Sequence, residues 1–119
     1  MAAALSITGF HDAVTYKIVK CTGITDTTNQ VNVTGSSGTL YAAYLDSANC
    51  TANVSLHILD PQRTTNTEFV VRGIGSSTSS LQIPTGFAFD QLNFYVSLNS
   101  IENDNTLFSG TVAVTLVCT

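Results

Sequence analysis

QLNFYVSLN, residues 91–99, has an apolar side chain at every second position and a polar or tyrosine side chain between them. Successive side chains of a β-strand point to opposite faces, so this period of two predicts a strand with one face in a core. The segment TVAVTLVC, residues 111–118, repeats the pattern near the end of the chain. Two such segments favour an all-β fold. The first segment is expected to turn four side chains to the core: Leu92, Phe94, Val96 and Leu98.

Outward from these two segments, six further stretches have the residue types and spacing of strands. Clusters rich in Gly, Pro, Asn and Asp separate them, and these residues adopt or stabilise turns. The first twelve residues show no firm period, so we expect an extended N-terminal arm at 1–12 and a single sandwich domain at 13–119. The expected strands are Ala13–Lys20, Gln30–Thr34, Thr39–Leu45, Ala52–Leu59, Glu68–Arg72, Ser80–Ile83, Gln91–Asn99 and Thr111–Cys118.

Short strands at this spacing in a chain of 119 residues predict an eight-stranded antiparallel β-sandwich that is jelly-roll-like, with two four-stranded sheets face to face. An immunoglobulin-like sandwich is the alternative, but such domains usually have a core tryptophan and this chain has none. The alternation also predicts the core: Val14, Tyr16, Ile18, Tyr41, Ala43, Val54, Leu56, Ile58, Phe69, Val71, Leu81, Ile83, Leu92, Phe94, Val96, Leu98, Val112, Val114 and Leu116.

The composition indicates a polar surface that is almost uncharged. Only 10% of the residues are charged, against about 25% in a typical globular domain. The net charge is −4, and the basic residues Lys17, Lys20, Arg63 and Arg72 form no cluster in the sequence. Nucleic-acid binding needs several cations along one face, so we expect no nucleic-acid partner. A surface of this kind suits packing against neighbours.

The cysteines indicate a reducing environment. Cys21, Cys50 and Cys118 are separated by 29 and 68 positions, which fits no zinc-binding pattern; their odd number allows one disulfide or none. The start, MAAALS at 1–6, lacks the basic and long apolar regions of a secretory signal, and no apolar run approaches the roughly 18 residues of a membrane helix. We therefore expect synthesis in a reducing cytosol, three free and mostly buried thiols, and no membrane partner.

The sequence offers no catalytic, metal or cofactor site. His57 falls on the polar side of its expected strand and His11 lies in the arm, so both are expected to be surface histidines. The segment ENDN, residues 102–105, is rich in oxygen ligands but lacks the glycine and terminal glutamate of a calcium loop, so we expect a solvated turn. We accordingly expect no cofactor and no enzymatic activity.

Two groups of residues are candidates for contact with a partner. The first is aromatic, because aromatic side chains carry a large share of interface energy: Phe87, Phe89, Tyr95 and Tyr44. For the two phenylalanines the first interpretation is that they cap the end of the core, and a role as exposed interface anchors is the alternative. The second group lies in the N-terminal arm, which either frays or adds as a strand to a neighbour's sheet edge: Leu5, Ile7 and Phe10.

The segment SGTVAVTLVC, residues 109–118, closes this pattern of short strands joined by loops rich in Ser, Thr and Asn. With its low charge and signal-free start, the whole chain resembles in architecture the small jelly-roll decoration (cement) proteins of tailed bacteriophage heads. The resemblance implies a homotrimer at three-fold or quasi-three-fold positions of the virion surface. It would be made in the host cytoplasm, bind the major capsid protein and stabilise the head.

A carbohydrate-binding β-sandwich, such as a lectin or adhesin-like module, is the alternative function, since jelly rolls also serve as lectins. Sugar rings stack on aromatic side chains while carboxylates and amides bind their hydroxyls. Tyr95 or Phe87, near Asp90 and Asn93, has the required residue types.

Overall fold

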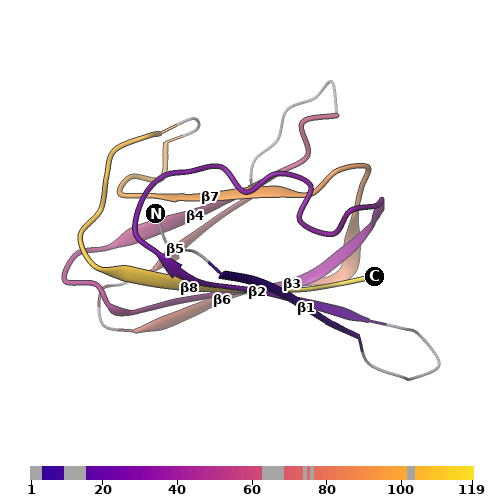
Figure 1. Cartoon of the computed structure of the whole chain (residues 1–119), viewed down its shortest axis with the longest axis horizontal. Helices are drawn as coiled ribbons and strands as arrows, with labels where there is room; N and C mark the ends of the chain where they lie inside the picture. The colour runs from indigo at the N-terminus through magenta and orange to yellow at the C-terminus, as the bar shows by residue number, and fades with distance from the viewer. Residues whose placement is uncertain (1–3, 10–15, 63–68, 74, 76, 102–103) are drawn as a thin grey trace.

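The computed structural model describes residues 4–9, 16–62, 69–73, 75, 77–101 and 104–119 of the chain. Among these residues there are strands and no helix, and the strands form two antiparallel sheets that pack face to face (Figure 1). The prediction of an all-β, sandwich-like fold is therefore confirmed. Its physical basis is the alternation of side chains along the strands, which lets each sheet contribute one face to a shared core.

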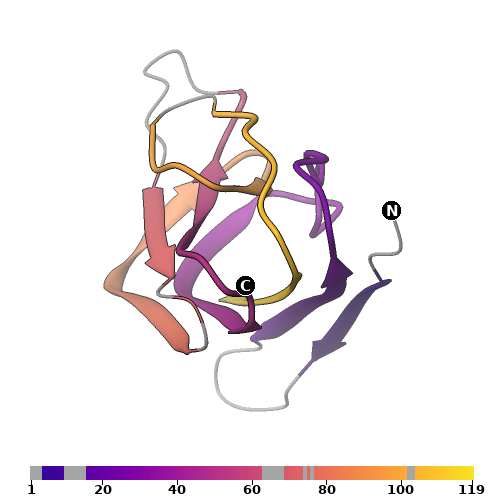
Figure 2. The same ribbon diagram turned by 90° about the vertical axis from the view of Figure 1, so that its left-hand side faces the viewer.

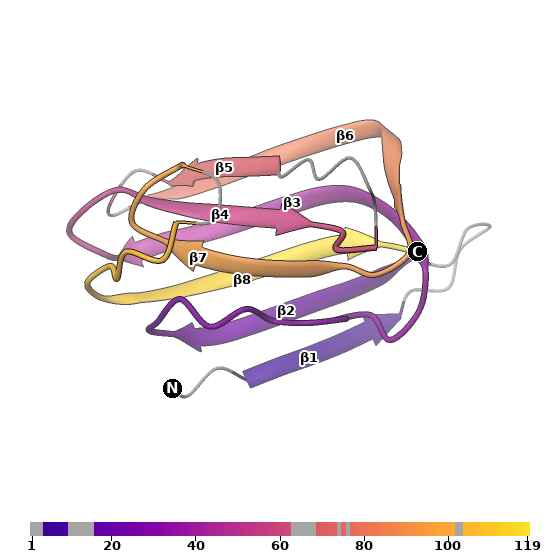
Figure 3. The same ribbon diagram turned by 90° about the horizontal axis from the view of Figure 1, so that it is seen from above.

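The larger sheet has the strand order β1-β2-β8-β3-β6 and the smaller one the order β5-β4-β7, as Figure 3 shows from above. All pairings between named strands are antiparallel. The strands are β1 (Ala4–Gly9), β2 (Lys17–Ile24), β3 (Gly38–Asn49), β4 (Val54–Leu59), β5 (Phe69–Gly73), β6 (Thr78–Phe89), β7 (Asn93–Ser97) and β8 (Thr111–Cys118).

Strand partners are nested in the sequence. The innermost pair is β4 with β5, the next is β3 with β6, and the outer pair is β2 with β8. Gln30, which lies between β2 and β3 in the sequence, forms an isolated antiparallel bridge with Phe94 of β7, which lies between β6 and β8. The expected strand Gln30–Thr34 is thus reduced to this bridge and to a bond from Val33 N to Leu92 O at 3.0 Å. Asn32 has a φ of +50°, which breaks the extended conformation between them.

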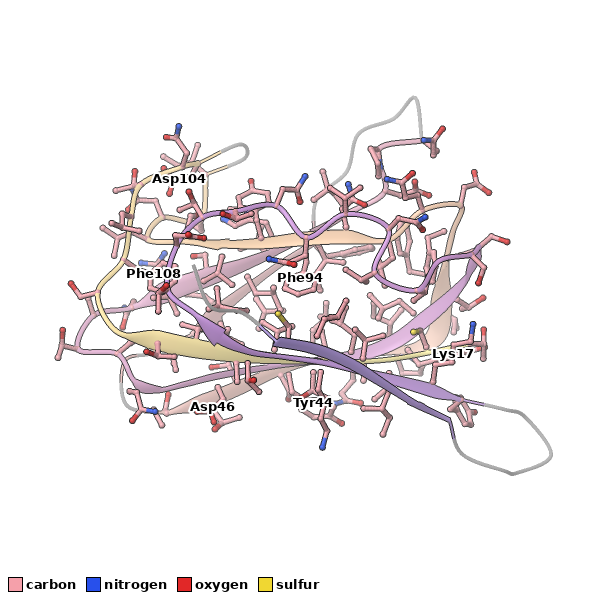
Figure 4. The ribbon with its side chains drawn as sticks, in the orientation of Figure 1. Lys17, Tyr44, Asp46, Phe94, Asp104 and Phe108 are labelled. Carbon is pink, nitrogen blue, oxygen red and sulfur yellow. The ribbon has the colours of Figure 1, made fainter. Side chains whose placement is uncertain are left out.

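The core lies between the sheets, and Phe94 of β7 is fully buried near its middle (Figure 4). The alternation correctly predicted most of the inward side chains of β4, β7 and β8. The buried residues among those expected are Ala43, Val54, Leu56, Ile58, Val71, Leu92, Phe94, Val96, Val112, Val114 and Leu116, and those partly buried against them are Phe69, Leu81, Ile83 and Leu98.

The predicted phase of β2 is wrong. Val19 and Cys21 face the core, at 1% and 0% exposure, whereas Ile18 and Tyr16 are only half-buried. The strand begins four residues later than expected, and apolar residues stand on both of its faces, so hydrophobicity alone did not determine which face is inward. Tyr41 is also half-buried rather than in the core, beside Tyr16 with ring centroids 5.7 Å apart. Val14 lies outside the described residues.

The turn expected after Ile83 is instead a bulge inside β6. Between the pairs Leu40–Phe87 and Ala42–Gln82, β3 has one intervening residue and β6 has four, at 83–86. Gly86 makes this possible because its φ is +79° and because a Cβ there would lie 2.3 Å from Thr39 Cγ2. The sequence correctly marked 84–86 as irregular, but these residues lie within the long strand β6 and do not separate two strands.

Phe94→Ala is expected to lower the free energy of unfolding by about 3–5 kcal/mol, because it removes a buried ring and leaves a cavity. Ile101→Ala is the matched control, since Ile101 is 71% exposed and its truncation should change stability by less than about 0.5 kcal/mol. Urea unfolding followed by fluorescence or circular dichroism measures both. Equal stability of the two variants would contradict the assignment of Phe94 to the centre of the core.

Candidate functional site

The outer face of the smaller sheet holds a polar cluster, which we define as Ser55, His57, Tyr95, Ser97 and Arg72; the first four are buried and Arg72 is exposed. His57, Ser55 and Ser97 are each 0% exposed. The prediction that His57 is a surface residue is therefore wrong. The reason is that Leu98 and Asn99, which follow β7, return over this face and accept hydrogen bonds from it.

Hydrogen bonds and ring stacking connect the polar cluster. His57 Nε2 lies 2.7 Å from Ser97 Oγ and 3.1 Å from the Asn99 carbonyl oxygen, which can only accept, so an Nε2–H tautomer fits. The His57 ring stacks on Tyr95, with centroids 4.2 Å apart and planes 5° apart. Arg72 Nη1 donates to Ser55 Oγ at 2.8 Å and to the Leu98 carbonyl at 3.1 Å. These contacts satisfy the buried polar atoms, so the polar cluster holds the loop after β7 in place.

Asp104 anchors the same loop from its far end (Figure 4). Its carboxylate accepts from Asn99 N at 3.0 Å and from Thr106 Oγ1 at 2.8 Å. Desolvation raises the pKa of this carboxyl, but the hydrogen bonds from Thr106, Asn99 and Ser97 outweigh it and lower the pKa to about 2. The acidic segment expected to be a solvated turn therefore contains a structural carboxylate.

Asp60 has a similar role at the opposite end of the smaller sheet. Its side chain is 2% exposed and accepts from the backbone N–H groups of Gln62, Asp90 and Gln91 at 2.9, 2.7 and 3.3 Å. These bonds tie the end of β4 to the connection between β6 and β7. Asn93, 3% exposed, similarly accepts from Asn32 N at 2.8 Å and holds the Gln30 segment against β7. Both buried polar groups thus have structural partners.

The four predicted interface aromatics do not form one surface. Phe89 is 3% exposed and Tyr95 is 9% exposed, so the structure contradicts both as exposed anchors: Phe89 caps the core, and Tyr95 covers His57. Phe87 is half-buried, with its ring edge-on to Phe69 at 4.7 Å. Tyr44 is 37% exposed and projects from the outer face of the larger sheet, where its hydroxyl accepts from Gln82 Nε2 at 3.3 Å. Of the four, Tyr44 alone keeps an exposed position.

The arm is partly a strand of the molecule's own sheet. Ala4–Gly9 forms β1 and pairs antiparallel with β2, with Leu5 opposite Cys21 and Ile7 opposite Val19. The division at residue 12 therefore separates β1 from a sheet to which it belongs. Leu5 is 45% exposed, and Phe10 lies outside the described residues. No period was visible here because six residues at a sheet edge need no amphipathic pattern.

The outer face of the larger sheet carries little charge. The register places Ile18, Val117 and Ala42 side by side in one row, and Lys20, Thr115 and Tyr44 in the next. Asp46 and Ala113 form a third row, and Figure 4 shows Tyr44 and Asp46 projecting away from the core. Among the described residues of β2, β8, β3 and β6 on this face, Lys20 and Asp46 are the charged ones.

Within the described residues there is no pocket and no group of side chains arranged to hold a metal ion. No helix among them has the length and hydropathy needed to cross a membrane. Cys21, Cys50 and Cys118 are buried, as predicted, and burial raises the pKa of all three thiols. Comparison with protein-family models, curated proteins and solved structures finds no match to this chain.

Because the pKa of Asp104 is lowered on folding, the free energy of unfolding should depend on pH in the acidic range. A carboxyl whose pKa falls from 3.8 to about 2 on folding stabilises the fold above about pH 4, and this contribution is lost as the pH falls through about 2. Asp104→Asn removes it, so the difference in free energy of unfolding between wild type and variant should shrink from pH 5 to about pH 2. Urea unfolding across this range measures it, with Asp90→Asn as the charge-matched control. A difference that stays constant with pH would contradict the assignment.

Proposed function

We propose that the protein is a structural virion protein: a jelly-roll decoration, or cement, protein that binds the outside of a phage head as a homotrimer and stabilises it. Its partners would be further copies of itself and the major capsid protein. The observation that supports this proposal best is the outer face of the larger sheet, which extends across four strands and has one positive and one negative side chain among its described residues. Such a face suits close packing against another protein.

The nested strand pairs support the jelly-roll part of the proposal. A jelly roll is a long antiparallel hairpin rolled into two sheets, so its pairs are nested and its first and last strands are neighbours. Here β2 pairs with β8, Gln30 bridges to β7, β3 pairs with β6, and β4 pairs with β5. On this interpretation the Gln30 segment is a strand reduced to one bridge, and β1 is an addition at the sheet edge.

The buried polar groups support a role in contact rather than sugar binding. The carbohydrate alternative relied on Tyr95 or Phe87 together with Asp90 and Asn93. Tyr95 and Asn93 are 9% and 3% exposed and are used within the chain, and Phe87 is half-buried against Phe69, whereas Asp90 is exposed. In contrast, the ring of Tyr44 is exposed on an open sheet face, where a protein surface reaches it without moving a loop. Of the four aromatic candidates, we therefore propose that Tyr44 contacts the partner.

The test is attachment to phage heads. Particles of the phage that encodes the chain should carry it on the capsid, and heads stripped of it should release DNA at a lower temperature. The purified chain should rebind stripped heads and restore the release temperature. Its mass by light scattering should correspond to three chains, with or without reductant.

Tyr44→Lys should weaken rebinding by about tenfold or more, because it places a charge in the packed surface. Leu107→Lys is the matched control, since it makes the equivalent change at a loop position that is 61% exposed. Absence of the chain from purified particles, or its presence only on tails, would overturn the proposal. Rebinding of Tyr44→Lys at the wild-type level would overturn the role of Tyr44.

A further inference from the structure

Three of the four sheet edges are protected within the chain. At the outer edge of β7, Gln30 and Phe94 exchange two backbone hydrogen bonds, at 2.7 and 3.0 Å. The edges of β5 and β6 lie along the same side of the sandwich (Figure 3). β5 is only five residues long and carries the exposed Arg72, and β6 contains Pro84, which has no N–H to donate. Charge, proline and short length are devices that discourage pairing with another chain.

The edge of β1 has neither a charged side chain nor a proline. β1 is the outermost strand of its sheet, and among the described residues its second edge has no paired strand. Its sequence, ALSITG at 4–9, contains no charge and no proline. A neutral six-residue strand with unpaired N–H and C=O groups is a template for another strand. Figure 2 shows β1 at the side of the molecule, away from the smaller sheet.

Leu5 is a second sign that this edge is incomplete. It lies opposite Cys21, which is 0% exposed, so both residues stand on the core-facing side of the sheet. Leu5 is nevertheless 45% exposed, because β1 lies beyond the smaller sheet that covers Cys21. An apolar side chain at this position would be covered by a strand added beyond β1.

We infer that β1 pairs with the β1 of a second copy of the chain, antiparallel about a two-fold axis perpendicular to the sheet. That axis keeps the core-facing sides of both sheets on one side, so the two Leu5 side chains share a face. Both copies use the same edge, so each β1 edge pairs with one other β1 edge and cannot add a third strand. The edge adds no charge of its own, so two chains of net charge −4 can approach there. This contact is independent of the proposed role on a phage head.

The contact is weak and depends on concentration. A pair of six-residue strands covers less surface than a stable interface of about 800 Å² per partner. Sedimentation equilibrium from micromolar to millimolar concentration should show the average mass of the wild type rising with concentration above its value at the lowest concentration, whether that starting particle holds one chain or three. Leu5→Lys should raise the dissociation constant by about tenfold or more, because an inward-pointing lysine blocks edge pairing. Leu107→Lys, the same change at an exposed loop position, should leave the dissociation constant at its wild-type value.

A wild-type mass that does not change with concentration would overturn the inference, as would a Leu5→Lys variant that associates like wild type. If Leu5→Lys unfolds, hydrogen exchange of the wild type decides: amides of 4–9 must gain protection as concentration rises, and unchanged protection overturns the inference. Tyr44→Lys keeps the β1 edge, so its average mass should still rise with concentration as that of the wild type does. A failure to bind phage heads therefore would not contradict β1 pairing, and a failure of β1 pairing would not contradict binding to phage heads.

Discussion

The rest of the structure depends on the pairing of the last strand, β8, with both β2 and β3. This strand lies between β2 and β3, so the larger sheet is continuous only when the end of the chain has inserted between two earlier strands. Its side chains at 112, 114, 116 and 118 are each at most 1% exposed and form the floor of the core. Most contacts in such a fold join residues far apart in sequence, so the loop-closure entropy must be offset by burial along this one strand.

The smaller sheet differs from the larger one because almost all side chains of β4 and β7 are buried on both faces, whereas β5 keeps Val70 and Arg72 exposed. Its inner face supplies Phe94 and its neighbours, and its outer face is the polar cluster around His57, covered by the loop after β7. The polar groups of this cluster form hydrogen bonds within the chain, whereas the outer face of the larger sheet and the β1 edge are open among the described residues. A protein built in this way is suited to contact with other proteins through nearly uncharged backbone and side-chain surfaces.

Regular alternation was the part of the sequence that could be interpreted correctly. Thr111–Cys118 was predicted with the bounds that β8 has, because apolar and polar residues alternate there without interruption. For β2, apolar residues on both faces concealed the phase. His57 and Tyr95 were misplaced because period-two reasoning assumes that the second face meets solvent, whereas Leu98 and Asn99 cover it. Long-range hydrogen bonds such as those of Asp60 leave no local pattern, so no window of sequence could have revealed them.

The most direct test of the central role of β8 uses the chain's own buried thiols. Cys21 lies on β2, which is joined to β3 only through β8, whereas Cys50 follows β3. Thiol labelling in increasing denaturant, read out by peptide mass spectrometry, gives the free energy of opening at each cysteine. If β8 makes the strands of the larger sheet one cooperative unit, Cys21 and Cys50 become reactive with the same free energy, equal to that of global unfolding. Labelling of Cys21 at a much lower free energy than Cys50 would contradict this account.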